Sequence, residues 1–327
     1  MGLEKLLNNF KAKRILIIGD AIIDSYLWGE INRMSPEAPV PVVDVQINQN
    51  DNRLGGAANV ALNLKELGAQ AILCTVIGND AKGILFEQLM QDQGLSLEGM
   101  LISDGRKTTT KTRVIVKDRH QLRIDEEDKH PIRVEHQLIS LFLKLSKNVD
   151  AIILQDYNKG VLTKNVISTV IKYANENNIP TIVDPKKDNF LSYKECTLFK
   201  PNLQEISEGL QINIDAKNLE NIKDITSKLR RKLKSKSILL TLSDKGICLN
   251  SNKQFLHYSS KTKNVVDVSG AGDTVVSIAA LCLASKINNK NLAIISNIAG
   301  GVVCEKVGVV PISFEELFKR VKSISNE

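Results

Sequence analysis

The chain has 327 residues, of which 43% are hydrophobic and 4% aromatic, and its formal net charge is +7. The hydrophobic fraction is sufficient for a large buried core, and the scarcity of aromatic residues argues against a surface that stacks nucleic-acid bases. The densest basic segment, 228–236, lies in a predicted helix and is typical of a solvated helix face, so we expect no nucleic-acid partner.

The cysteines and the apolar segments indicate the cellular location of the protein. Five cysteines are scattered without CxxC spacing, which is typical of reduced core residues in a cytosolic protein. The N-terminus has no basic and apolar leader, and no apolar run approaches the ~20 residues of a membrane span. The sequence therefore predicts a cytoplasmic protein with no membrane partner.

Strand and helix patterns alternate along most of the chain. Residues 14–20 are a run of branched apolar residues ending in Gly19-Asp20, which is typical of a buried parallel strand. Later segments repeat this pattern of a short apolar strand, a polar strand end and a helical return. Further strands are predicted at 71–77, 151–156, 180–184, 197–200 and 237–242, and helices at 60–67, about 81–93, 163–177, 272–285, 290–305 and 313–324.

This alternation predicts an α/β fold with a doubly wound, mainly parallel sheet. Ligands of such sheets bind beyond the carboxyl ends of the strands, where the polar clusters of this chain would lie together. No G-x-G-x-x-G follows the first strand, which argues against a dinucleotide site. No linker or internal repeat divides the chain, so we expect a single domain over 1–327.

Two segments interrupt the alternation, at about 26–53 and 108–125. The first contains three prolines between Met34 and Pro41, followed by an alternating strand over 42–47. The second is rich in β-branched residues. Both are poor core material, and together they predict a small β-sheet that folds over the site as a lid. Because exposed edge strands tend to pair with other strands, we also expect a homodimer.

The segment Val266–Thr274 carries the strongest chemical signal. Gly270, Ala271 and Gly272 are small, so backbone N–H groups at the start of the following helix can converge on an anion. Asp273 falls in the first turn, where it would cap the helix if it had no other role. A carboxylate beside an anion cradle suits a general base that deprotonates an attacking hydroxyl while the cradle holds a phosphoryl group.

Two further clusters are candidates for ligand contacts. Gly55 and Gly56 precede a helix whose first turn contains Asn59, and this pattern fits either close approach to a ligand or tight packing of the helix. Asp24 follows the first strand closely, so it faces a ligand if the strand ends at the site.

The order of these motifs resembles the ribokinase, or phosphofructokinase-B, family of sugar kinases. The resemblance covers essentially the whole chain and adds the segment Asn202–Glu205 and the position of Asp267 to the motifs above. It implies a ribokinase-like fold and an ATP-dependent phosphotransferase that acts on an alcohol group. It also implies Mg²⁺ and, as in many relatives, a monovalent cation such as K⁺.

The resemblance also implies roles for individual residues. Asp273 is the implied base, and the backbone N–H groups of Gly270, Ala271 and Gly272 form the anion hole. Glu205 is implied to act on Mg²⁺ indirectly, and Asp267 to bind the monovalent cation. The implied contacts to sugar hydroxyls are Asp24, Gly55, Gly56 and Asn59, and those to the nucleotide are Asn202, Leu203, Gln204, Glu205, Ser243, Asp244, Gly246 and Asn297.

Several stretches are most similar to family members that phosphorylate D-glycero-β-D-manno-heptose 7-phosphate. Those enzymes act on the C1 hydroxyl and give the 1,7-bisphosphate for ADP-heptose and lipopolysaccharide core synthesis. The proline-rich stretch 33–42 is the most specific likeness. A sugar phosphate also needs cations beyond those that serve ATP. The candidates are Arg33, Arg113, Lys159 and Lys186.

Two alternatives remain open at this stage. The acceptor is another sugar or sugar phosphate, such as a hexose phosphate, ribose or fructose, or the chain is a non-catalytic regulator that binds a sugar phosphate. Many similar enzymes also carry a C-terminal adenylyltransferase, whereas this sequence ends at Glu327 without an HxGH-type motif after Asp273. We therefore expect the adenylyltransferase activity on another polypeptide or in a missing C-terminal half.

Overall fold

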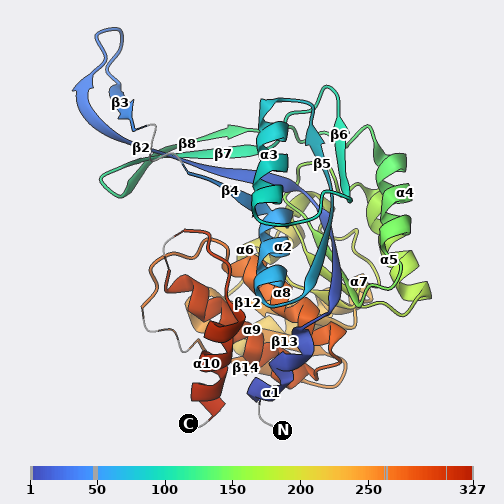
Figure 1. Ribbon diagram of the computed structural model, residues 1–327. Helices are drawn as coiled ribbons and strands as arrows, with labels where there is room; N and C mark the ends of the chain where they lie inside the picture. Colours follow the sequence, from blue (N-terminus) through green and yellow to red (C-terminus); the bar gives the residue numbers. More distant parts are fainter. Residues whose placement is uncertain (1–2, 47–50, 261, 263, 307, 326–327) are drawn as a thin grey trace.

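Strand β1 (Arg14–Gly19) lies at the centre of a large sheet and is almost completely buried. The computed structural model describes residues 3–46, 51–260, 262, 264–306 and 308–325 (Figure 1). Within these residues, nine strands form the sheet in the order β14-β13-β12-β11-β10-β9-β1-β5-β6. Their bounds are β5 (Gln70–Gly78), β6 (Met100–Ser103), β9 (Ala151–Gln155), β10 (Thr181–Asp184), β11 (Leu198–Phe199), β12 (Ser237–Thr241), β13 (Ile247–Ser251) and β14 (Phe255–Tyr258).

The strands from β12 to β6 in this order are parallel, and β13 pairs antiparallel with both of its neighbours, β12 and β14. Side chains along β1 alternate between two hydrophobic cores. Ile15 and Ile17 belong to the core on one face of the sheet, and Leu16 and Ile18 to the core on the other. A strand buried on both faces must be apolar throughout, which is why the run at 14–20 predicts it.

Helices cover both faces of the sheet (Figure 1). The predicted α/β fold with a doubly wound, mainly parallel sheet is therefore confirmed. The helices whose residues belong to the core of Ile15 are α1 (Leu3–Leu7), α2 (Ala57–Glu66), α3 (Ala81–Asp92), α8 (Ala271–Ala284), α9 (Asn289–Cys304) and α10 (Phe314–Ser325). Those in the core of Leu16 are α4 (Glu135–Leu145), α5 (Lys164–Glu176), α6 (Leu203–Leu210) and α7 (Leu219–Leu233).

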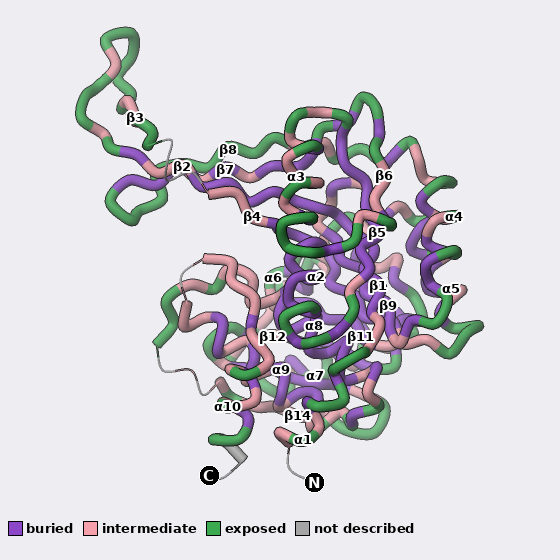
Figure 2. The backbone as a smooth tube through the Cα atoms, viewed as in Figure 1, coloured by how far each residue is buried: buried purple, intermediate pink, exposed green. Residues whose placement is uncertain are grey.

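A smaller, mostly antiparallel sheet projects from this body (Figure 1). It contains β2 (Ala21–Met34), β3 (Pro41–Val45), β4 (Asp51–Gly56), β7 (Thr110–Val116) and β8 (Arg119–Glu126). Strand β2 pairs with β3, β4 and β7, so the two segments that interrupt the alternation meet in one sheet. Figure 2 shows that the start of β2 is buried, whereas β8 is exposed along its length and the end of β2 is exposed.

The first interruption starts earlier than expected. The small sheet begins at Ala21, directly after β1, rather than near residue 26. Ile22 and Ile23 at the inner end of β2 are buried, so the apolar pattern of β1 continues into β2. The sequence pattern therefore does not mark the residue at which the chain passes from the large sheet to the small one. Residues 47–50 of the expected segment lie outside the described residues.

Among the described helices, none combines the length and the apolar character that crossing a bilayer requires.

Asp20, at the junction of the two sheets, fixes the loop that follows β9. Its buried carboxylate accepts hydrogen bonds from the backbone N–H groups of Tyr157 at 2.8 Å, Lys159 at 3.0 Å and Val161 at 3.1 Å. The N–H groups of this loop have no strand partner, so the side chain of Asp20 takes the place of a β-ladder. The loop is thereby held at the carboxyl edge of the large sheet.

Replacing Asp20 with alanine removes the acceptor for all three N–H groups. We expect the free energy of unfolding to fall by about 3 kcal/mol or more, because each buried donor without a partner costs roughly 1–3 kcal/mol. Urea-induced unfolding measures this change. The control is Asp150→Ala at the other end of β1, where a half-exposed carboxylate accepts from Arg14 N at 2.8 Å. Equal losses in the two variants would contradict the role of Asp20.

Candidate active site

A cavity of about 750 Å³ lies at the carboxyl edge of the large sheet. Its size is in the range of small-molecule and cofactor sites. Segments that follow β9, β10, β11 and β12 meet there with the start of α8 and one face of α9. The predicted site residues that line it are Lys186, Asn202, Leu203, Gln204, Glu205, Ser243, Asp244, Gly246, Gly270, Ala271, Gly272, Asp273 and Asn297.

The residues of the predicted cradle lie at the start of α8. Gly270 caps the helix with a φ of +79°, a conformation that favours glycine. At Gly272 an added Cβ would lie 3.7 Å from Lys200 Nζ and 3.8 Å from an oxygen of Asp184. The N-terminal end of the helix and the Lys200 ammonium therefore face the same space, which suits an anion, although the N–H of Ala271 also donates to the carbonyl of Val268 at 3.3 Å.

The carboxylate of Asp273 is buried beside this cradle and accepts three hydrogen bonds. Asn59 Nδ2 donates to Oδ2 at 2.7 Å, while Tyr157 Oη donates to Oδ1 at 2.8 Å and Gln155 Nε2 donates to Oδ1 at 3.0 Å. The donors come from α2, from β9 and from the loop that Asp20 holds. Asn59, predicted to contact the sugar, therefore contacts the predicted base directly.

Burial is the main cause of a raised pKa at this carboxylate. Desolvation raises the pKa of Asp273 to about 6, and repulsion from Asp184 acts in the same direction. The hydrogen bonds from Asn59 and Tyr157 and the charge of Lys200 lower the pKa in opposition. A carboxyl group with a pKa near neutrality is ionised at pH 7 and still basic enough to accept a proton during a reaction.

Charged pairs continue from Asp273 across the cavity wall. Gln155 Nε2 also approaches Asp184 at 3.2 Å, and Asp184 pairs with Lys200 at 3.0 Å. Lys186 forms an ion pair with Glu205 and lies over the ring of Tyr157, 5.5 Å from its centroid. Burial disfavours the charged form of Lys186, but Asp184 and Glu205 outweigh it and raise the pKa, so this side chain is a cation in the cavity.

The segment Asn202–Glu205 also has a structural role. Asn202 Oδ1 accepts from the N–H of Glu205 at 2.8 Å, and Glu205 Oε2 accepts from the N–H of Asn202 at 2.8 Å. This reciprocal capping box starts α6 and fixes both side chains at the cavity. The pattern Asn-x-x-Glu thus positions a carboxylate that a metal-bound nucleotide can approach.

The remaining sugar-side candidates lie where the small sheet joins the body. Arg113 donates to Asp24 at 2.6 Å and lies over the ring of Tyr26. An added Cβ at Gly55 would lie 2.2 Å from Asp24 Oδ2, so glycine leaves room for this carboxylate. Gly56 has a φ of +57° and caps α2. These glycines serve close packing, and contact with a sugar stays a prediction.

Three other predicted residues lie apart from the cavity wall. The buried Lys159 pairs with Glu127 at 2.6 Å. Arg33 is exposed towards the outer end of β2. Asp267 accepts from the N–H groups of Ser269 and Gly308, both at 2.9 Å. The proposed phosphate contacts and the monovalent-cation site therefore stay predictions, and the described residues contain no cluster of three or more potential metal ligands.

Lys200, Gln155, Tyr157 and Asp184 were not predicted as site residues. Each lies in or directly after a strand of the large sheet, so a strand-end position is the signal that could have found them.

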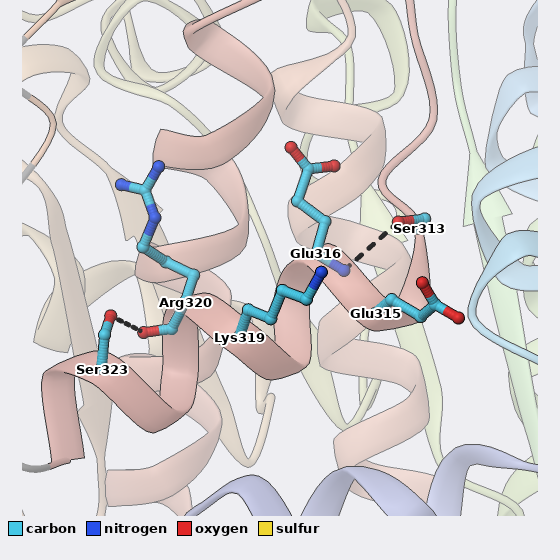
Figure 3. A pocket seen from close by; sticks show the side chains of 6 residues that line it. All are labelled: Ser313, Glu315, Glu316, Lys319, Arg320 and Ser323. Atoms are coloured by element: carbon cyan, nitrogen blue, oxygen red, sulfur yellow. Dashed lines mark hydrogen bonds between the residues drawn. The ribbon is translucent and has the colours of Figure 1, made fainter.

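A separate hollow, of about 490 Å³, runs along α10 and contains none of the predicted residues (Figure 3). Two of its charged side chains have partners nearby, since Glu316 pairs with Lys306 at 2.6 Å and Arg320 with Glu305 at 2.5 Å.

Comparison with known proteins identifies the family. Residues 12–315 match the pfkB family of carbohydrate kinases. The chain belongs to the pfkB family. The resemblance drawn from the sequence motifs is therefore confirmed, and this pfkB protein is a carbohydrate kinase, a phosphotransferase for sugars. Membership of the family implies ATP as phosphoryl donor.

Relatives of this pfkB kinase include proteins with a second activity. It is 40% identical over 313 residues to a Nitratiruptor protein named bifunctional protein HldE, and 41% identical over 315 residues to the protein of the same name from Campylobacter jejuni strain RM1221. The alignments cover 95% and 96% of this chain but 65% and 66% of the relatives. The chain thus spans about two thirds of the length of the curated relatives it matches.

Solved structures show that the fold is ribokinase-like. Phosphofructokinase-2 from Escherichia coli, crystallised with potassium, matches with a TM-score of 0.80 at 17% identity, covering 96% of this chain and 99% of that one. Ribokinase from Arabidopsis thaliana, complexed with ribose and ATP, matches with a TM-score of 0.73 at 18% identity, covering 95% and 99%. At such low identity these likenesses concern the fold.

Substitution of Gly272 by valine tests the cradle. The Cβ itself makes only ordinary contacts with Lys200 and Asp184, so we expect the variant to fold. The two methyl groups would occupy the space in front of the helix N–H groups, and the Michaelis constant for ATP should rise roughly tenfold, equivalent to about 1.4 kcal/mol. Initial rates against ATP concentration measure this, with the melting temperature as a check of folding. Unchanged ATP kinetics would exclude phosphate from the cradle.

Proposed function

We propose that this chain transfers the γ-phosphoryl group of ATP to the C1 hydroxyl of D-glycero-β-D-manno-heptose 7-phosphate. The observation that carries the kinase chemistry is the buried Asp273 carboxylate beside the anion cradle of α8 and Lys200. The heptose assignment is supported by the likeness of stretch 33–42 to heptose-7-phosphate kinases and by relatives named HldE.

The residues support a direct transfer between two oxygen atoms. The C1 hydroxyl attacks the γ-phosphorus, its proton passes to Asp273, and the bond between the γ-phosphorus and the bridging oxygen breaks to release ADP. The N–H groups from Gly270 to Asp273 and the ammonium of Lys200 stabilise the negative charge on the transferred group. Because these donors are fixed by the helix and by the pair with Asp184, they need little rearrangement.

The donor set of the cavity fits a magnesium nucleotide. Glu205 and Asn202 present oxygen atoms, which Mg²⁺ prefers, beside the cationic Lys186 and the cradle. Bound Mg²⁺ would neutralise charge on the nucleotide phosphates. We infer that Glu205 acts on the metal indirectly, because its two oxygens already bind Lys186 and the N–H of Asn202. Asp267 is our candidate for a monovalent cation such as K⁺.

Arg113 is the best placed candidate for the sugar phosphate. It lies at the junction of the small sheet and the body and is held by Asp24, so its second face can meet a ligand from the lid side. Lys186, the other candidate near the base, lines the cavity. The same arrangement suits a hexose phosphate, and the base and the cradle alone would also serve an unphosphorylated sugar such as ribose or fructose, so these remain alternative acceptors. A non-catalytic regulator is disfavoured because the base and the cradle are both present.

A panel of acceptors tests the function. ADP release is measured with magnesium-ATP and heptose 7-phosphate, fructose 6-phosphate, ribose or fructose. We expect turnover only with heptose 7-phosphate, and a loss of roughly 10²–10⁴-fold in Asp273→Asn, because the amide cannot accept the proton. Turnover with another sugar would retain the kinase and reject the heptose assignment. If no acceptor gave turnover while the protein still bound ATP, the result would favour the non-catalytic regulator.

The product of this reaction would be consumed by an adenylyltransferase. The relatives are named bifunctional and are longer than this chain, which supports a second activity on another polypeptide or in a C-terminal half. We place both steps in the cytoplasm, where ATP is available.

We also propose a homodimer formed through the small sheet. Strand β8 is an edge strand, and all its residues are exposed. An exposed edge with apolar side chains is a surface that pairs readily with another chain. Large exposed apolar side chains of this sheet and its turns are Met34, Val40, Val45, Leu122 and Ile124.

Charges on β8 should separate the two copies. Leu122 and Ile124 are 49% and 46% exposed on the same face of the strand, and replacing both with glutamate would bury charges in the proposed interface. We expect wild-type protein to have a dimer mass by light scattering and the double variant a monomer mass. The control is Ile84→Glu on α3, where the side chain is 70% exposed and the dimer should persist. A monomeric wild type would reject the dimer.

A further inference from the structure

The hydroxyl of Tyr157 contacts the candidate base from the cavity side. Tyr157 lines the cavity, and its Oη donates to Asp273 Oδ1 at 2.8 Å. We propose that Tyr157 is a positioning residue: with Gln155 it holds Oδ1 of Asp273, so that Oδ2 is the oxygen that takes the proton from the acceptor hydroxyl. This inference rests on the proposed role of Asp273 as the base.

The hydrogen bonds at Asp273 distinguish its two oxygens. An ionised carboxylate offers about two lone-pair directions on each oxygen. Both directions on Oδ1 are taken, by Tyr157 Oη and Gln155 Nε2. Among the described residues, Oδ2 has one donor, Asn59 Nδ2 at 2.7 Å. One direction on Oδ2 is therefore left for an acceptor hydroxyl.

Oδ2 is also the oxygen beside the cradle. The amide of Asn59, which binds Oδ2, lies only 3.4 Å from the position of an added Cβ at Gly270. Gly270 is the cap of α8 and the first residue of the cradle. A hydroxyl that donates to Oδ2 is thus next to the place where the phosphoryl group would be held, as in-line attack requires.

The position of Tyr157 is fixed at both ends. Its backbone N–H donates to Asp20 at 2.8 Å, and its ring lies under Lys186. Burial raises the pKa of its hydroxyl well above the usual value, and the negative charges of Asp273 and Asp184 act in the same direction. The hydroxyl therefore remains protonated and able to donate to Asp273.

Other charged groups also act on Asp273, and none of them changes when the hydroxyl of Tyr157 is removed. Asp184 at the end of β10 and Lys200 directly after β11 act on the carboxylate, and Lys186 is close enough for mutual attraction. The contacts from α2 and β9 are neutral amides. A variant that lacks only the hydroxyl thus removes one hydrogen bond from the ionised carboxylate, and the carboxylate becomes more basic.

The Tyr157→Phe variant tests this role through the pH dependence of kcat/KM. A base must be ionised, so activity is lost as the pH falls through its pKa. Loss of a hydrogen bond to the charged form should move this acidic limb to higher pH by roughly one unit. We also expect kcat to fall roughly tenfold while the Michaelis constant for ATP stays within about twofold. Ionisations of the substrates are common to all variants and cancel in the comparison.

Tyr193→Phe is the matched control. The hydroxyl of Tyr193 donates to another buried carboxylate, Asp156, at 2.5 Å, and has no recorded contact with Asp273. We expect its acidic limb to stay in place even if stability falls. Replacement of Tyr157 by 3,5-difluorotyrosine, whose hydroxyl is a stronger donor, provides a second variant of nearly native shape, and its acidic limb should move to lower pH.

An acidic limb unchanged in both Tyr157 variants would overturn the proposal, and so would equal shifts in Tyr157→Phe and Tyr193→Phe. The Asp273→Asn variant separates this failure from failure of the base assignment. Normal turnover in Asp273→Asn would reject the base itself. An inactive Asp273→Asn with an unshifted Tyr157→Phe would reject only the role of Tyr157.

Discussion

The hydrogen bonds accepted by Asp20 connect the parts of this structure. Three N–H groups of the loop after β9 converge on one buried carboxylate at the end of β1, and β2 starts at the next residue. The large sheet, the small sheet and the loop that carries Tyr157 therefore share one fixed point. Because an N–H group without a partner is costly inside a protein, this point constrains the position of everything attached to it.

Charge balance determines the chemistry of the cavity. Asp184 repels the charges of both Glu205 and Asp273, while Lys186 pairs with Glu205 and Lys200 pairs with Asp184. Within the described part of the chain Asp273 forms no ion pair, and its direct contacts are neutral donors; together with the charge of Lys200 they compensate its burial only in part, so its pKa rises to about 6. Both lysines line the cavity, where they can attract phosphate.

Several residues combine a structural and a chemical role. Asn202 and Glu205 form the capping box of α6 and also line the cavity. Gly55 leaves room for the carboxylate of Asp24, and Gly270 provides the helix cap at the cradle. The structural interpretation of these motifs and the functional one are therefore not alternatives, because a helix start is itself a place where free N–H groups meet a ligand.

The sequence by itself determined the sheet, the helices and the cradle, since runs of apolar residues, caps and glycines act through their near neighbours. Tertiary structure decided which residues meet Asp273: its donors Asn59, Gln155 and Tyr157 lie 214, 118 and 116 positions away in the chain. No local pattern encodes such contacts, because they arise only when strand ends from distant segments are brought to one edge. The same reason explains why Arg33 and Lys159, predicted from their charge and their positions in the expected lid or after a strand, lie apart from the cavity.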